Sequence, residues 1–159
     1  MTISVGDKIP SVSVMMATAE GPQKADAADV LGKGKVAFFA VPGAFTPTCS
    51  AKHLPGFVQN ADALKKKGVD KIVCMSVNDA FVMKAWGDSQ NAAGVEMMAD
   101  GNGDLAKALG LTMDASGFGM GARSKRFSAI IENGVVKELN VEGPGEFKVS
   151  SAEHMLGQL

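Results

Sequence analysis

The stretch Lys35-Val-Ala-Phe-Phe-Ala-Val41, followed at once by Pro42-Gly-Ala-Phe-Thr-Pro-Thr-Cys49, decides the fold. Its first half is a near-continuous apolar run, which is typical of a strand buried on both faces of a sheet. Its second half leads into residues 54–64, where apolar side chains recur at helical spacing. A buried parallel strand needs a helical crossover to reach the next strand, so this segment predicts the start of an α/β sheet.

The rest of the chain continues the alternation of strands and helices. A second buried strand is expected at 71–77, and Asn78 or Asp79 would cap a helix that carries Phe81, Val82, Ala85 and Trp86. The remaining elements expected are a strand at 11–16 ending in a Gly21-Pro22 turn, helices at 25–31 and 104–109, a strand at 95–98, a hairpin from 127 with an Asn133-Gly134 type I′ turn, and a terminal helix to 156 capped by Ser150 or Ser151. We expect residues 117–121 to form a mobile loop and residues 1–159 to form one α/β domain.

Composition narrows the class of protein. The 159 residues are 46% apolar and 21% charged, and 16 basic residues face 17 acidic ones, for a net charge of −1. This balance argues against a partner that is a nucleic acid or an anionic membrane surface. No apolar run approaches the ~20 residues of a membrane span, and the N-terminus lacks the features of a secretory signal. We expect a cytoplasmic protein, or an organellar one if a presequence has been removed.

The two cysteines occupy different settings. Thr46 is a good N-cap with Pro47 at the first helical position, which places Cys49 in the first helical turn. The free N–H groups and the positive end of the helix dipole favour a thiolate there, and we expect the sulfur to be open to solvent. Cys74 lies within a Val/Ile/Met strand and is expected to be a buried, unreactive packing residue.

Other readings of these residues remain open. Cys49 and His53 are four residues apart on one helix face, so a metal pair or a Cys–His dyad is an alternative. Two ligands do not close a zinc site and His154 follows no ligand spacing, so we expect neither a metal nor a cofactor. Pro55 lies inside the same helix and is expected to kink it.

The segment around Cys49 resembles the peroxidatic-cysteine signature of the peroxiredoxins, Pro-x-x-x-Thr-x-x-Cys, and its Pro-Gly-Ala-Phe-Thr-Pro form resembles the type II group. Similarity extends from about Gly6 to the end of the chain, with further matches at His53-Leu-Pro-Gly-Phe57, Ser76-Val-Asn-Asp-Ala-Phe81, Arg123-Ser-Lys-Arg-Phe127 and Gly145-Glu-Phe-Lys-Val-Ser-Ser-Ala-Glu153. The resemblance implies a thioredoxin-like fold, with a central mixed β-sheet flanked by helices, and an enzyme that reduces hydrogen peroxide and alkyl hydroperoxides.

The resemblance also implies roles for four residues. Cys49 would attack the peroxide as a thiolate and become a sulfenic acid, and the Thr46 hydroxyl would contact the sulfur and the peroxide. Pro42 would screen the site from water, and Arg126 would stabilise the thiolate and the charge that develops as the O–O bond breaks. From the residues alone, Arg126 belongs to an ordinary basic cluster before a strand; period-2 alternation puts Lys125 on the opposite face.

The reductant and the oligomer follow from the same resemblance. Residues 145–159 contain no cysteine, and Cys74 matches the second cysteine of plant type II members. A bridge between Cys49 and Cys74 would need unfolding of the active-site helix, so we expect a one-cysteine cycle with an external thiol, either glutathione with glutaredoxin or thioredoxin. A homodimer is implied, with Ala44, Phe45, Phe118 and Met120 at its interface.

Two rival functions use the same fold. One is a redox-sensing or chaperone-like interaction protein that uses Cys49 with low turnover, and the other is a non-catalytic thioredoxin-fold module. The presence of Thr46, Cys49 and Arg126 together favours the enzyme.

Overall fold

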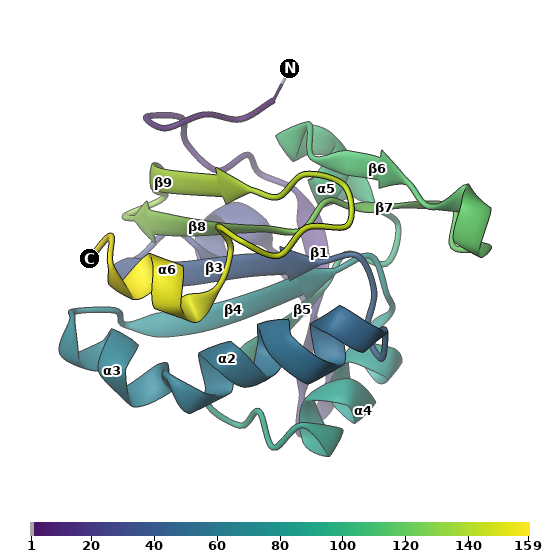
Figure 1. Ribbon diagram of the computed structural model, residues 1–159, viewed down its shortest axis with the longest axis horizontal. Helices are drawn as coiled ribbons and strands as arrows, with labels where there is room; N and C mark the ends of the chain where they lie inside the picture. The colour runs from purple at the N-terminus through teal and green to yellow at the C-terminus, as the bar shows by residue number, and fades with distance from the viewer. Residues whose placement is uncertain (1) are drawn as a thin grey trace.

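The protein, seen here in a computed structural model that describes residues 2–159, is built on a mixed seven-stranded sheet with the strand order β2-β1-β5-β4-β3-β8-β9. Helices cover both faces of the sheet (Figure 1). This confirms the expected α/β architecture. The strands of the sheet are β1 (Ser13–Thr18), β2 (Gly21–Asp26), β3 (Lys35–Val41), β4 (Lys71–Ser76), β5 (Glu96–Ala99), β8 (Phe127–Glu132) and β9 (Val135–Val141).

Strand β3 lies inside the sheet, between β4 and β8, and has the bounds predicted from its apolar run. It pairs in parallel with β4 and antiparallel with β8. Its odd-numbered residues from Ala37 to Val41 pack with the helices α2 (Leu54–Gln59), α4 (Ala80–Ser89) and α6 (Ala152–Leu156), and its even-numbered residues pack on the opposite face with α1 (Ala27–Val30) and α5 (Asp104–Leu109). One strand therefore contributes to both hydrophobic cores, which is why polar alternation is absent from it.

Methionine fills much of these cores. Met75 and Met98 lie in the core shared with α1 and α5, and Met83 and Met155 lie in the core shared with α2, and none of the four has exposed surface. An unbranched thioether adapts to gaps that branched side chains leave between helix and sheet.

The helix that follows β3 is broken into pieces. A π-helical turn, η1 (Cys49–His53), precedes α2, and α3 (Ala61–Lys66) follows it. The N–H of Leu54 bonds to the carbonyl of Cys49, five residues back. Pro55 has no N–H for the ordinary bond to a carbonyl four residues back, which gives a physical reason for irregularity here. The distortion expected from Pro55 is thus a π turn that begins at the cysteine itself.

Most other elements lie where the sequence places them. Asp79 caps α4 through the N–H of Val82, and Ser151 caps α6 through the N–H of His154. Asn133 and Gly134 have positive φ angles of 50° and 81°, as a type I′ turn between β8 and β9 requires. No helix in the described part of the chain has the length and apolarity to cross a membrane.

The structure corrects one expectation: Gly21-Pro22 begins strand β2 rather than forming a turn. Residues 117–121 lie within a short arm made of β6 (Thr112–Asp114), η2 (Ser116–Phe118) and β7 (Ala122–Ser124). In α4 the buried face consists of Ala80, Met83, Trp86 and Gly87. Phe81 lies outside this buried face and is 74% exposed.

Candidate active site

Cys49 lies beyond the carboxyl end of β3, in the first turn of the helix that follows this strand. The helix begins at Pro47, so the predicted position of the cysteine is correct. Its side chain is completely buried and packs in the same core as Phe39, Leu54 and Phe57. The expectation that the sulfur is open to solvent is therefore wrong: the π turn directs it into the core.

Arg126 brings a positive charge to this buried sulfur. It lies between β7 and β8, and its Nη2 donates to the Sγ of Cys49 at 3.1 Å. Lys125, its neighbour, is exposed, in keeping with the opposite directions that consecutive extended residues take. The guanidinium thus places a fixed positive charge in direct contact with the sulfur.

His53, on the next turn of the helix, contacts the same guanidinium. Its Nε2 lies 2.9 Å from the carbonyl oxygen of Ser150, and its Nδ1 lies 2.9 Å from Nη1 of Arg126. A carbonyl only accepts and a guanidinium only donates, so Nε2 carries the proton and Nδ1 is the acceptor. Burial, together with the positive charge of Arg126, lowers the pKa of His53 to about 3. Both ring nitrogens are occupied, so the geometry does not support a Cys–His dyad or a metal pair.

Aromatic rings enclose these polar groups. The ring of Phe147 lies 5.0 Å from that of His53, and the Cζ of Arg126 lies 5.9 Å from the same phenyl centroid. On the sheet side, the ring of Phe39 lies 4.9 Å from His53 and stacks on Phe57 at 4.0 Å. The imidazole of His53 is completely buried among these rings, and the guanidinium of Arg126 is half-buried beside them.

Glu142 organises the chain on the far side of His53, and sequence reasoning missed it. Its carboxylate accepts the backbone N–H groups of Lys148, Val149 and Ser150 at 2.8–2.9 Å, and the Ser150 hydroxyl at 2.7 Å. Burial works to raise the pKa of Glu142, but these hydrogen bonds hold it below its ordinary value. No local pattern marks this residue, because its partners are six to eight positions away in an irregular loop.

The segment before the helix, residues 42–48, is held by side chains from other loops. Asn78, which follows β4, accepts the N–H of Ala44 at 2.9 Å, and Nη1 of Arg123 reaches the carbonyl of the half-buried Pro42 at 3.4 Å. Thr46 donates its hydroxyl proton to the carbonyl of Gly43 at 2.7 Å. Thr46 was expected to cap the helix with its side chain; the hydroxyl instead closes the turn that precedes it, and its proton is not directed at the sulfur.

Cys74 lies on β4, on the same face of the sheet as Cys49. It pairs across the sheet with Phe39 and Met97 and has no exposed surface. Burial raises its pKa well above the ordinary value, and the neighbouring Cys49 adds to this shift. As predicted, Cys74 is buried; its thiol form is the stable one.

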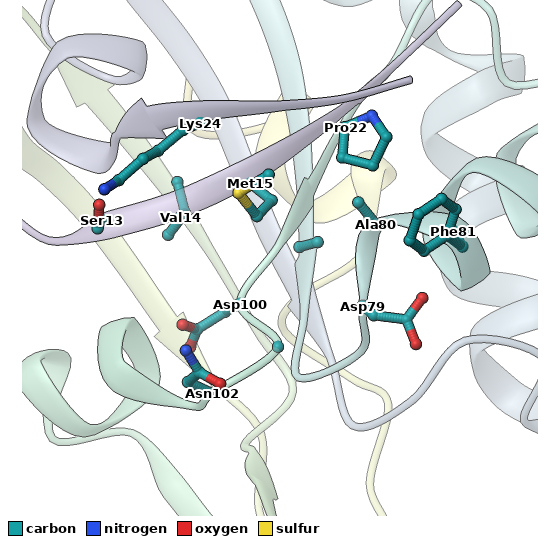
Figure 2. Close-up of a pocket in the computed structure, with 12 residues that line it drawn as sticks. Ser13, Val14, Met15, Pro22, Lys24, Asp79, Ala80, Phe81, Asp100 and Asn102 are labelled. Carbon is teal, nitrogen blue, oxygen red and sulfur yellow. The ribbon is translucent and has the colours of Figure 1, made fainter.

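A separate cavity of about 430 Å³ lies beside the start of α4, between the β1–β2 hairpin and the end of β5. Figure 2 shows Lys24, Asp79, Phe81 and Asp100 around it. None of the residues assembled around Cys49 lines this cavity, so it is not the site described above. Within residues 2–159, no group of three His, Cys, Asp or Glu side chains is placed to hold a metal ion.

Comparison with known families and sequences gives consistent results. A family model described as Redoxin matches residues 4–156. The chain is 50% identical to peroxiredoxin-2E-2, chloroplastic, from Oryza sativa subsp. japonica, over 99% of this chain and 73% of that one. It is 46% identical to peroxiredoxin-2D from Arabidopsis thaliana, over 99% of this chain and 98% of that one.

Solved structures are similar over the same length. Reduced Prx3 from Vibrio vulnificus, in complex with hydrogen peroxide, is 52% identical, with a TM-score of 0.95 over 99% of both chains. A one-cysteine peroxiredoxin from Plasmodium falciparum, an antioxidant protein, is 28% identical, with a TM-score of 0.89 over 96% of both chains.

The neutral state of His53 predicts a loss of stability in mild acid. In the unfolded chain the imidazole takes up a proton near its ordinary pKa of 6.5, whereas in the fold it does so only near 3. The unfolded state therefore binds more protons throughout this window, and the free energy of unfolding falls as the pH drops. Between pH 7 and pH 5, His53 alone should account for a loss of about 2 kcal/mol, at about 1.4 kcal/mol per pH unit below 6.5.

Urea denaturation of the wild type and of His53→Gln at the two pH values measures this loss. The variant should show a smaller difference between pH 7 and pH 5. His154→Gln is the matched control, because His154 is exposed and should leave the wild-type loss intact. An equal loss in the wild type and in His53→Gln would contradict the assignment of a neutral, buried His53.

Proposed function

The chain belongs to the peroxiredoxins, within the type II group, and we propose that Cys49 is the cysteine with which it reduces hydroperoxides. The activity of the family is thiol-dependent peroxide reduction, and this chain is such an oxidoreductase. Family membership favours the peroxidase over the redox-sensing or chaperone-like alternative. The single observation that carries the assignment of Cys49 is the 3.1 Å contact between its sulfur and Nη2 of Arg126.

In the proposed first step, the Cys49 thiolate attacks the terminal oxygen of a hydroperoxide. A sulfur–oxygen bond forms and the O–O bond breaks, so that sulfur is oxidised to a sulfenic acid and the peroxide is reduced. The remaining alkoxide or hydroxide takes up a proton and leaves as an alcohol or water. Arg126, which stabilises the thiolate at the start, also faces the negative charge that moves onto the peroxide oxygens in the transition state.

Thr46 and Pro42 complete the proposed site. Because the Thr46 hydroxyl donates its proton to Gly43, its lone pairs are free to accept the O–H of the bound peroxide. Pro42 directly follows β3 and would cover the approach to the helix start, where water would otherwise compete with the peroxide. The complex of the Vibrio vulnificus relative with hydrogen peroxide supports a substrate of this class.

The proposed second half of the cycle uses an external thiol. A thiol attacks the sulfenic sulfur, water leaves, and the mixed disulfide is then reduced by another thiol, with glutathione and glutaredoxin or thioredoxin as the source. Cys49 has no exposed surface, so this step needs local unwinding of η1. Cys74 is held in the central sheet with its thiol form stabilised, which supports a one-cysteine cycle.

We also propose that this single domain of residues 1–159 acts as a homodimer in the cytoplasm. Three exposed phenylalanines lie in segments that follow the carboxyl ends of β3, β4 and β6: Phe45, Phe81 and Phe118, which are 55%, 74% and 84% exposed. The Ala44–Asn78 bond joins the first two segments, and the Met120 side chain packs against Gly43. The exposed apolar surface thus gathers beside the cysteine loop, and a second copy would cover it.

The first prediction from the proposed function concerns the roles of Cys49 and Arg126. Cys49→Ser should abolish peroxide reduction, and Arg126→Gln should slow the reaction with hydrogen peroxide by about 10²–10³-fold, the usual cost of losing one oriented donor to a developing anion. Stopped-flow fluorescence follows the step, because the only tryptophan, Trp86, donates to Ser50, next to Cys49, at 2.9 Å. Lys125→Gln is the control and should keep the wild-type rate. A fast reaction in Arg126→Gln would refute the role of the arginine.

A second prediction separates the two cysteines. After one equivalent of peroxide, the intact protein should gain ~16 Da, the mass of one oxygen in a sulfenic acid, and should not lose the ~2 Da of an internal disulfide. Cys74→Ser should show the same gain and keep its turnover with external thiols. Its free energy of unfolding should fall by about 1–3 kcal/mol, because a hydroxyl would be buried among apolar side chains. A 2 Da loss that disappears in Cys74→Ser would replace the one-cysteine cycle with an internal one.

The third prediction concerns association. Sedimentation at micromolar concentration should show a species of about 33 kDa, twice the chain mass of 16.4 kDa. Phe81→Ser should shift the equilibrium toward monomer, because it removes a large apolar contact from the proposed interface. Val5→Ser provides the control, since Val5 is also exposed, at 60%, but lies in the N-terminal segment. A wild type that stays monomeric would rule out the dimer.

A further inference from the structure

We propose that Glu142 and His53 are positioning residues for the peroxidase reaction: Glu142 fixes the loop of residues 148–150, the loop fixes His53, and His53 turns the Arg126 guanidinium toward Cys49. The inference rests on the proposed function of Cys49 and Arg126. According to this proposal, Glu142 affects the reaction rate although its carboxylate does not contact the sulfur of Cys49.

The first step is the grip of Glu142 on the loop. One carboxylate oxygen, Oε2, collects the N–H groups of Lys148, Val149 and Ser150 and the Ser150 hydroxyl, all within 2.9 Å. Three consecutive backbone donors turned onto one anion leave the loop little freedom. The backbone N–H of Glu142 in turn donates to the carbonyl of Arg126 at 2.9 Å, so the same residue is also tied to the arginine's main chain.

The second step is the choice of tautomer at His53. With its N–H groups directed at Glu142, the loop presents the Ser150 carbonyl to the imidazole, and that carbonyl takes the proton on Nε2. The lone pair on Nδ1 is then left as the acceptor. A loop in another conformation would leave the tautomer unspecified, and the other tautomer would present an N–H to a guanidinium that has only donors.

The third step is the orientation of Arg126. The guanidinium is planar and rigid, so a hydrogen bond that fixes Nη1 also fixes the direction of Nη2. Nη1 donates to Nδ1 of His53 at 2.9 Å while Nη2 points at the sulfur at 3.1 Å. Phe147, which directly precedes the loop, lies over the guanidinium at 5.9 Å. Without the imidazole acceptor, the positive charge of Arg126 remains near the sulfur, but Nη2 is no longer held in the direction of the sulfur.

Two variants of His53 separate this role from a purely structural one. Asn places its side-chain oxygen near the position of Nδ1 and can still accept from Arg126, but it is too short to reach Ser150. Gln places its amide near Nε2 and can still donate to Ser150, but it offers Arg126 no acceptor at the Nδ1 position. If His53 positions Arg126, His53→Asn should react with hydrogen peroxide faster than His53→Gln, and His53→Gln should lose about 10–100-fold relative to wild type.

Each variant is also measured against an uncharged alkylating agent, iodoacetamide, at the same pH. Alkylation depends on the thiolate but does not need a donor directed at a breaking O–O bond. The ratio of the peroxide rate to the alkylation rate should therefore fall in His53→Gln, whereas simple loosening of the fold would not lower it. If His53→Gln matches or exceeds His53→Asn in its peroxide rate, His53 acts by anchoring the loop and the proposal fails.

Glu142→Gln tests the first link, with Glu146→Gln as the matched control. An amide cannot replace the charge that gathers three backbone donors, so Glu142→Gln should lower the peroxide rate and the ratio to alkylation in the same direction as His53→Gln. Glu146 lies in the same region but forms an exposed ion pair with Lys148, and its variant should behave as wild type. Equal rates in the two glutamate variants would overturn the role of Glu142.

The proposed function fails in a different way from this inference. If Cys49→Ser still consumed peroxide, the assignment of the reacting cysteine would be wrong regardless of Glu142 and His53. If wild type reacts quickly, Cys49→Ser does not, and the His53 and Glu142 variants keep the wild-type rate, then only the positioning chain is wrong.

Discussion

The contact between the Arg126 guanidinium and the sulfur of Cys49 is the interaction on which the polar groups of this side of the sheet depend. Cys49 has no exposed surface, so this contact brings a positive charge to the margin of an apolar core. The half-buried guanidinium then needs partners for its remaining donors. His53 supplies one acceptor, and Phe147 supplies an aromatic face. Each polar group on this side of the sheet thus needs the next one as a partner, because a buried polar group without a hydrogen bond destabilises the fold.

The sheet determines which segments can meet at this point. Because β3 and β4 are parallel neighbours, the loops that follow them leave the sheet at the same edge, and Asn78 can hold the cysteine loop through Ala44. The antiparallel partner of β3, strand β8, begins at that edge, which brings Arg126 to the sulfur from the other side. Strand β9 then returns and ends beside the start of β8, where Glu142 bonds to Arg126.

Sequence patterns specify the parts of this arrangement that depend on local chemistry. The apolar runs of β3 and β4, the Asn133-Gly134 turn and the position of Cys49 at a helix start all follow from neighbouring residues. Strand β2 was missed because its residues, Gly-Pro-Gln-Lys-Ala-Asp, lack apolar alternation at the edge of the sheet. The contacts of Arg126 with Cys49 and His53 span 77 and 73 residues, so only the family resemblance could select that arginine. The π turn at Cys49 and the hydrogen bonds of Glu142 to residues 148–150 follow from no local sequence pattern and are seen only in the folded structure.

The methionine thioethers packed against both faces of the sheet are protected from oxidation only while the chain is folded. Met75, Met83, Met98 and Met155 have no exposed surface while the chain is folded, and they are therefore shielded from dissolved peroxide. Unfolding in the presence of peroxide would expose them together, and their sulfoxides are polar groups that no longer fit an apolar interior. A molecule that unfolds in the presence of peroxide would thus have its core methionines oxidised by its own substrate. It could not refold until a reductase converted the sulfoxides back to thioethers.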